Sequence, residues 1–117
     1  MATLLIVDDE YVITEILECI FEDEGYTVVK TVSAVNALKV LDCVRPDLVI
    51  TDFMMPVMNG VELAIAIRAH PVFHQLPIVL MTGGAADQAQ ATSGLFTKIV
   101  TKPFDVKAMI QTIQSLL

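Results

Sequence analysis

Short runs of β-branched and other apolar residues alternate along the chain with longer segments in which apolar residues recur at helical spacing. The short runs are almost continuously apolar, which is typical of parallel strands that are covered on both faces of a sheet. Five runs therefore predict five strands, namely Thr3–Val7, Thr27–Thr31, Leu48–Thr51, Ile78–Met81 and Ile99–Thr101.

The segments between and after these strands predict five helices. The first apolar stripe ends at Gly25, a usual helix stop, and the second begins behind Ser33, a suitable N-cap. The third ends before Pro71, and the last follows Asp105, another candidate N-cap. Residues 85–93 are polar and predict the fourth helix from the weakest of the five patterns. Five strand–helix units in order predict an α/β fold, a doubly wound domain with a five-stranded parallel sheet and five helices.

Length and composition narrow the class of protein. A chain of 117 residues predicts a single domain, and a hydrophobic content of 55% excludes a disordered protein. No apolar run approaches the ~20 residues of a membrane span, and no basic segment of a signal peptide precedes Asp8-Asp9-Glu10. Cys19 and Cys43 lie on helical segments and are expected to be reduced residues in or near the core. These features predict a cytoplasmic protein, and the net charge of −7 argues against direct nucleic-acid binding.

Polar side chains follow four of the predicted strands. Asp8 and Asp9 follow the first strand, and Asp52 follows the third. Thr82 follows the fourth strand and Lys102 the fifth. Because ligands of open parallel sheets bind beyond the carboxyl ends of the strands, these side chains are expected to lie at one edge. Each residue alone has an ordinary structural explanation, such as a helix cap or a turn, but their combination favours a functional site.

Three carboxylates at one edge repel one another. A like-charged pair roughly 4 Å apart costs about 4 kcal/mol at an effective dielectric constant of about 20. Lys102 compensates one of the charges, and the remaining negative charge calls for a divalent cation. Mg²⁺ is favoured because the ligands are hard oxygens without a His or Cys pair beside them.

Four motifs together resemble those of one family. They are Asp8-Asp9-Glu10, Asp52-x-x-x-Pro56 running on to Gly60, Thr82-Gly83, and Lys102-Pro103-Phe104. With this spacing the chain resembles, over essentially all 117 residues, the receiver domains of two-component response regulators. The resemblance implies a flavodoxin-like sheet with strand order 2-1-3-4-5. It also implies that residues 1–117 form one receiver domain without an output domain in this chain.

The resemblance implies a role for each acidic residue. Asp52 would be the phosphoacceptor, taking a phosphoryl group from a histidine kinase or a phosphotransfer protein. Asp8, Asp9, Asp52 and the backbone carbonyl of Met54 would bind Mg²⁺. Phosphoryl transfer requires mainly positioning and charge neutralisation, which agrees with such a site.

The resemblance also implies how the domain switches. Lys102 would pair with a phosphoryl oxygen, and Thr82 would hydrogen-bond the phosphoryl group and draw its loop inward. Ile99 stands where many receivers have an aromatic switch residue, so coupling through an aromatic side chain is not expected. Met54 and Gly84 occupy positions that tune self-dephosphorylation in the family. Neither side chain can orient a water molecule, which implies slow hydrolysis.

The leading hypothesis is therefore a phosphorylation-controlled switch or relay that acts through a downstream protein and is not an enzyme on a separate substrate. One alternative is a docking module of the same fold that works without phosphorylation, which Ile99 keeps open. A Mg²⁺-dependent phosphatase is disfavoured, because such enzymes use a second Asp where this chain has Met54. Flavin binding is disfavoured as well, since Asp8-Asp9-Glu10 would repel a phosphate group.

Overall fold

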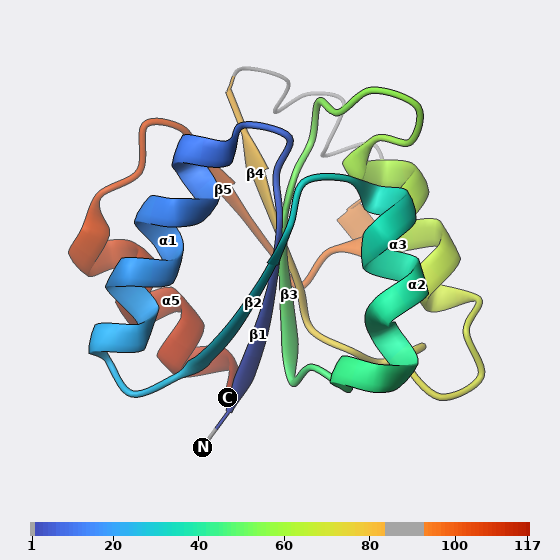
Figure 1. The fold of residues 1–117 in the computed structure, drawn as a ribbon, viewed down its shortest axis with the longest axis horizontal. Helices are drawn as coiled ribbons and strands as arrows, with labels where there is room; N and C mark the ends of the chain where they lie inside the picture. The colour runs from blue at the N-terminus through green and yellow to red at the C-terminus, as the bar shows by residue number, and fades with distance from the viewer. Residues whose placement is uncertain (1, 84–92) are drawn as a thin grey trace.

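The protein folds around a five-stranded parallel sheet with strand order β2-β1-β3-β4-β5, which confirms the predicted fold class and strand order (Figure 1). The computed structural model describes residues 2–83 and 93–117. The strands are β1 (Thr3–Val7), β2 (Thr27–Thr31), β3 (Leu48–Asp52), β4 (Ile78–Thr82) and β5 (Lys98–Thr101).

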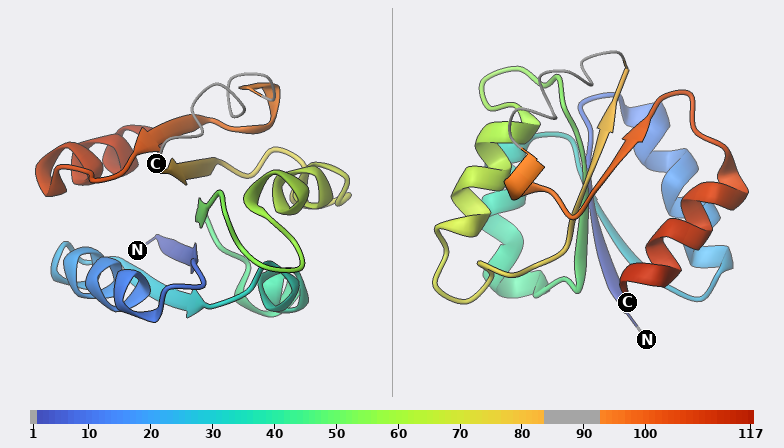
Figure 2. Two further views of the ribbon diagram at one scale, coloured as in Figure 1. Left: turned by 90° about the horizontal axis from the view of Figure 1, so that it is seen from above. Right: turned by 180° about the vertical axis from the view of Figure 1, so that it is seen from behind.

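Helices cover both faces of the sheet. Helices α1 and α5 lie on one face and α2 and α3 on the other, and the view from above shows the same two layers (Figures 1 and 2). Residues 85–92 of the predicted fourth helix, and Gly84 before them, lie outside the described residues. The described helices are α1 (Tyr11–Asp23), α2 (Ala34–Val44), α3 (Gly60–Arg68), α5 (Val106–Leu116) and the short 3₁₀ helix η1 (Ser93–Leu95).

The core consists of two apolar clusters, one on each face of the sheet. Successive residues of β1 alternate between them, with Leu4 and Ile6 packing toward α1 and α5, and Leu5 and Val7 toward α2 and α3. All four side chains are fully buried, because both faces of the strand are covered. This double burial explains why the strands are continuously apolar in the sequence.

The prediction that the two cysteines lie in or near the core was wrong. Cys19 and Cys43 are both exposed. Cys19 stands between the buried residues Leu17 and Phe21 of α1, and a rotation of about 100° per residue turns it toward solvent. The predicted N-caps are confirmed, because the side chains of Ser33 and Asp105 each accept a hydrogen bond from a backbone N–H of the helix that follows.

Strand register brings the carboxyl ends of the strands to one edge of the sheet. Val7 of β1 pairs with Thr31 of β2 and with Thr51 of β3. One residue further, Asp52 pairs with Met81 of β4. Thr82 in turn pairs with Thr101 of β5. Asp52 and Thr82 therefore belong to their strands, one residue beyond the predicted strand ends, and this pairing holds both of them in the buried part of the edge.

The loop after β3 is closed at its base by a glycine. The Gly60 N–H donates to the carbonyl of Phe53 at 2.9 Å. A Cβ atom at Gly60 would lie 2.3 Å from the carbonyl oxygen of Asp52, so no other residue fits without moving this backbone. Asn59 and Glu62 then form a capping box that starts α3. The loop thus returns the chain directly beneath Asp52.

The tip of this loop is strained. Val57 has φ 71°, and the Met58 N–H donates to the Pro56 carbonyl at 2.8 Å, so Val57 is the centre of a three-residue turn. A β-branched residue with positive φ is a steric outlier. The side chain of Val57 is 94% exposed, so packing does not offset the strain.

Val57→Gly is expected to increase the free energy of unfolding by about 1 kcal/mol. Relief of left-handed strain is worth ~1–2 kcal/mol, and the added freedom of glycine in the unfolded chain offsets part of that gain. Urea denaturation measures the change. Val72→Gly is the matched control, because Val72 is exposed and lacks a positive φ, and this substitution is expected to decrease the stability. An equal decrease in both variants would contradict strain at Val57.

Candidate functional site

The carboxyl edge of the sheet carries a pocket of about 370 Å³ whose lining includes charged side chains. Asp52 and Thr82 reach it from the ends of β3 and β4, and Lys102 reaches it from the residue after β5. The Lys102–Pro103 peptide bond is cis. The lining residues are Glu10, Asp52, Phe53, Met54, Thr82, Gly83 and Lys102.

One ammonium group bridges two buried carboxylates. Lys102 Nζ lies 3.2 Å from Asp8 Oδ2 and 3.1 Å from Asp52 Oδ1. Asp8 is fully buried and Asp52 is 6% exposed. Burial acts to lower the pKa of Lys102, but the hydrogen bond to Asp52 and the charges of both carboxylates raise it above its usual value. Lys102 is therefore held in its charged form.

The environment of Asp8 opposes its negative charge. Burial is the main cause that raises the pKa of the Asp8 carboxyl, and the nearby charge of Asp52 adds to it. The Glu10 backbone N–H, which donates to Asp8 Oδ1 at 2.9 Å, acts in the opposite direction, as does Lys102. The net effect is a raised pKa, so the ionised carboxylate is costly in the absence of a further cation.

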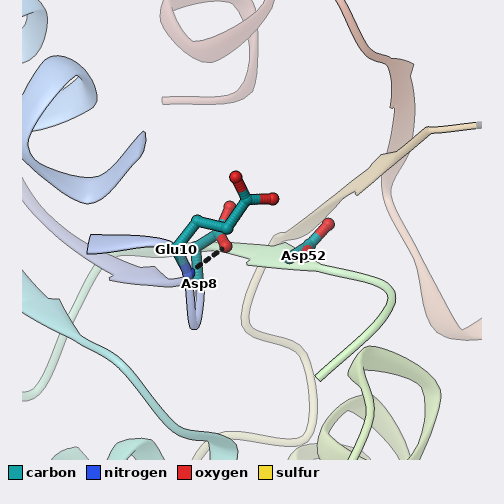
Figure 3. Close-up of side chains that lie close together, drawn as sticks. All are labelled: Asp8, Glu10 and Asp52. Atoms are coloured by element: carbon teal, nitrogen blue, oxygen red, sulfur yellow. Dashed lines mark hydrogen bonds between the residues drawn. The ribbon is translucent and has the colours of Figure 1, made fainter. Parts of the chain in front are cut away.

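A third carboxylate joins this pair. Asp8, Glu10 and Asp52 each offer an oxygen atom within 4.8 Å of the others. Figure 3 shows the Glu10 side chain extending over Asp8 on the side of Asp52, and its dashed line marks the bond from the Glu10 N–H to Asp8. Glu10 is the N-cap residue of α1 but its side chain makes no capping hydrogen bond. Its carboxylate is therefore available to the pocket.

The resemblance implied Asp9 rather than Glu10 as the acidic partner. In the structure Asp9 is exposed and lines a separate hollow with Met54, Met55 and Pro56. Glu10 was missed because a third acidic residue before a helix reads as a favourable charge at the helix N-terminus. The signal that points to it is its place directly after the Asp pair, in the short connection between β1 and α1.

Thr82 and Ile99 occupy different environments. Thr82 is buried at the end of β4, lines the pocket, and its carbonyl accepts the Lys102 backbone N–H at 2.8 Å. Ile99 lies in β5 and packs against the apolar cluster on the α2–α3 face of the sheet. The structure thus joins Thr82 to Lys102 through the backbone and places Ile99 away from the residues that line the pocket.

The donor set suits a hard divalent cation. Three carboxylate groups converge on a pocket that one ammonium group only partly neutralises. Mg²⁺ is bound in proteins through one or two carboxylates with water or substrate oxygens, so the residues present fit this ion.

Among the described helices, none is long and apolar enough to cross a membrane.

A doubly wound parallel sheet with an acidic pocket and a bridging lysine at its carboxyl edge defines a class of α/β domain that binds ligands at that edge. Residues 4–114 match the family model of the response regulator receiver domain. The chain therefore belongs to the receiver domain family of two-component systems, which are generally switch domains rather than enzymes.

Similar proteins agree with this family. The chain is 38% identical over 109 residues to sporulation initiation phosphotransferase F of Bacillus subtilis, covering 88% of this chain and 83% of that protein. The chemotaxis response regulator CheY4 of Vibrio cholerae superposes with a TM-score of 0.92 at 30% identity, covering 100% and 99% of the two chains. The response regulator TrrA of Thermotoga maritima, solved in complex with Mg²⁺–BeF, gives a TM-score of 0.90 at 31% identity over the full length of both chains.

Some relatives are much longer than this chain. It matches the transcriptional regulator RpaA of Synechocystis at 28% identity over 119 residues, which cover 100% of this chain and 49% of RpaA. The chain therefore spans about half the length of RpaA.

Asp8→Asn is expected to raise the melting temperature by about 4 °C at pH 7 in chelator-treated buffer. Since folding raises the pKa of Asp8 above its ordinary 3.8, the folded state binds the proton more tightly than the unfolded chain. The contribution of Asp8 to stability is thus fully present below pH 3.8 and is lost as the pH rises through the raised pKa. The advantage of the variant should shrink as the pH falls toward 3.8. Thermal unfolding between about pH 3.5 and pH 7 measures this trend.

The control for this series is Asp23→Asn, since Asp23 is an exposed acid at the end of α1. Its effect is expected to stay within about 0.5 kcal/mol at every pH. A stability gain in Asp8→Asn that does not change with pH would contradict the burial of an ionised Asp8.

Proposed function

We propose that this chain is a phosphoacceptor switch or relay of a two-component system, in which Asp52 receives a phosphoryl group from a histidine kinase or a phosphotransfer protein. The observation that carries the proposal is the Asp52 carboxylate at the pocket, 3.1 Å from Lys102 Nζ. The match of residues 4–114 to the receiver family supports it. Residues 1–117 act in this proposal as one receiver unit.

The transfer step requires an in-line attack by Asp52. A carboxylate oxygen of Asp52 forms a bond to phosphorus, the phosphorus–nitrogen bond of the phosphohistidine breaks, and the imidazole leaves with the bonding electron pair. The product is a mixed anhydride of the Asp52 carboxyl and phosphate. Lys102 already lies against Asp52 Oδ1, so its ammonium group needs only a small movement to pair with a phosphoryl oxygen.

Mg²⁺ supplies charge neutralisation and orientation to the phosphoryl oxygens when it is bound. Asp8, Asp52 and the Met54 backbone carbonyl remain its proposed ligands, together with Asp9. The grouping of Glu10 with Asp8 and Asp52 supports a contribution from Glu10 as well. The Mg²⁺–BeF complex of the similar TrrA protein supports the choice of ion.

The proposed switch runs through Thr82. A phosphoryl group on Asp52 would gain a hydrogen bond from the Thr82 hydroxyl, and Thr82 shares a backbone hydrogen bond with Lys102. Ile99 lies on β5, where it pairs with Leu80 of β4, and responds by packing rather than by rotation of an aromatic ring. A downstream protein binds the altered surface, and this chain itself does not contact nucleic acid.

We place the protein in the cytoplasm, where free thiols such as those of Cys19 and Cys43 are usual.

The phosphatase alternative is weakened by the pocket itself. Met54 occupies the place of the general acid and is 69% exposed, and a thioether cannot donate a proton. A docking module that works without phosphorylation remains the competing function, and the next experiment separates the two.

Incubation with acetyl phosphate and Mg²⁺ is expected to add one phosphoryl group to the protein, measured by intact mass. Asp52→Asn should abolish the gain, because an amide cannot form the acyl phosphate, and hydroxylamine should release the group from the wild type. A phosphorylated histidine phosphotransfer protein is the second donor. If neither donor labels the wild type, or if Asp52→Asn is labelled equally, the proposed function is wrong.

Glu10→Gln is expected to weaken Mg²⁺ binding about tenfold. Removing one unit charge a few ångströms from a divalent ion costs on the order of 1.4 kcal/mol even in a solvated pocket. Isothermal titration with Mg²⁺ measures the affinity without any phosphodonor. Glu22→Gln is the matched control, because this substitution removes the same charge at a distant place. Glu22 lies 12 residues further along α1, about 18 Å from Glu10.

The same titration of Asp9→Asn tests the ligand set that the resemblance implies. A loss equal to that of Glu10→Gln would place Asp9 among the ligands after a rotation of its side chain. An unchanged affinity in Glu10→Gln would contradict a role for Glu10.

A further inference from the structure

Met54 differs from the other described methionines in its exposure. It is 69% exposed, whereas Met55 is 9%, Met81 is 0% and Met109 is 1% exposed. Met58 is half-buried. Oxidation of a thioether requires access of the oxidant to sulfur, so Met54 is the described methionine that an oxidant in solution reaches most readily.

Met54 also borders the phosphorylation pocket. It lines the pocket that contains Asp52, Thr82 and Lys102, and it lines the neighbouring hollow beside Asp9 as well. A chemical change in this side chain therefore alters a wall of the pocket. The other wall residue of the same loop is Phe53, which is apolar and 6% exposed.

We propose that Met54 is a site of reversible oxidation by peroxides and that its sulfoxide shortens the lifetime of the phosphoryl group on Asp52. The second half of the proposal rests on the proposed phosphoacceptor function. The oxidant is hydrogen peroxide or an organic hydroperoxide. A thiol-dependent sulfoxide reductase returns the side chain to methionine.

The oxidation step is balanced by the peroxide alone. A lone pair of the Met54 sulfur attacks one peroxide oxygen, the oxygen–oxygen bond breaks, and a sulfur–oxygen bond forms. The second oxygen takes up the remaining proton and leaves as water, or as an alcohol when the oxidant is an organic hydroperoxide. Sulfur loses two electrons and the peroxide gains them.

The product changes what the pocket wall offers to water. A thioether sulfur is a weak hydrogen-bond acceptor, and Phe53 offers none, so this wall holds a water molecule poorly. The sulfoxide oxygen is a strong acceptor and can hold a water molecule at the mouth of the pocket. Such a water can attack phosphorus while the bond to the Asp52 oxygen breaks, and Lys102 stabilises the carboxylate that leaves. The released product is inorganic phosphate.

The experiment compares phosphoryl lifetimes before and after oxidation. The protein is treated with hydrogen peroxide and then with dithiothreitol, which reverses oxidation of the exposed Cys19 and Cys43 but leaves a sulfoxide unchanged. Peptide mapping is expected to find one added oxygen on the peptide that contains Met54. After phosphorylation and donor removal, the half-life of the acyl phosphate should fall about fivefold, the effect of one net hydrogen bond.

Three variants keep the result interpretable. Met54→Leu cannot be oxidised at this position and is expected to keep the same half-life with and without peroxide. Met54→Gln places an amide oxygen there and should shorten the half-life without peroxide. Met58→Leu is the matched control from the same loop and should respond to peroxide like the wild type.

Oxygen added at Met58 before Met54, or an unchanged half-life in protein that is oxidised at Met54, would overturn the proposal. Absence of phosphorylation in untreated protein is a different result. It overturns the proposed function and the hydrolysis half of this proposal, whereas peptide mapping still decides whether Met54 is the oxidised residue.

Discussion

The structure of this edge depends on one cation between two buried acids. Lys102 Nζ lies 3.2 Å from Asp8 and 3.1 Å from Asp52, both of which are shielded from water. Without the ammonium group the two carboxylates would face each other uncompensated, at a cost of several kcal/mol. The strand order explains how three residues so far apart in sequence meet. Strands β1 and β3 are neighbours in the sheet, and β5 lies two strands from β3, on the far side of β4.

Backbone geometry then holds the acids where the lysine can reach them. Asp52 is fixed twice, by strand pairing with Met81 and by the close approach of Gly60 to its carbonyl oxygen. Thr82 is tied to Lys102 through the bond from the Lys102 N–H to its carbonyl. Asp52 is therefore connected to Thr82 through its ion pair with Lys102 and the backbone hydrogen bond of Lys102. The strained residue Val57 lies at the exposed tip of the loop, apart from the backbone contacts that hold Asp52.

The fold was largely predictable from the sequence, because strands that are covered on both faces consist of consecutive apolar residues. The N-caps Ser33 and Asp105 were predictable too, because each bonds to the helix that directly follows it. The convergence of Asp8, Asp52, Thr82 and Lys102 was also predictable, because the carboxyl ends of parallel strands share an edge. Side-chain directions were not. Whether Asp9 or Glu10 turns toward the pocket depends on the backbone at the start of α1, where Glu10 caps the helix without using its side chain. The exposure of Cys19 and Cys43 depended on helix phase, which a stripe of apolar residues indicates only approximately.

The charge balance of the pocket links the metal to the phosphoryl group. With Asp8, Glu10 and Asp52 ionised and Lys102 protonated, the group carries three negative charges and one positive charge, a net charge of −2. In the proposed function, phosphorylation would replace the single charge of Asp52 with about −2, which would make the net charge about −3. A cation that binds the pocket is thus favoured more strongly after phosphorylation than before, and by linkage the cation stabilises the phosphorylated form by the same free energy. In the proposed function a phosphoryl oxygen on Asp52 would compete with Asp8 for Lys102, and the hydrogen bond from the Lys102 N–H to the Thr82 carbonyl would connect a movement of Lys102 to β4.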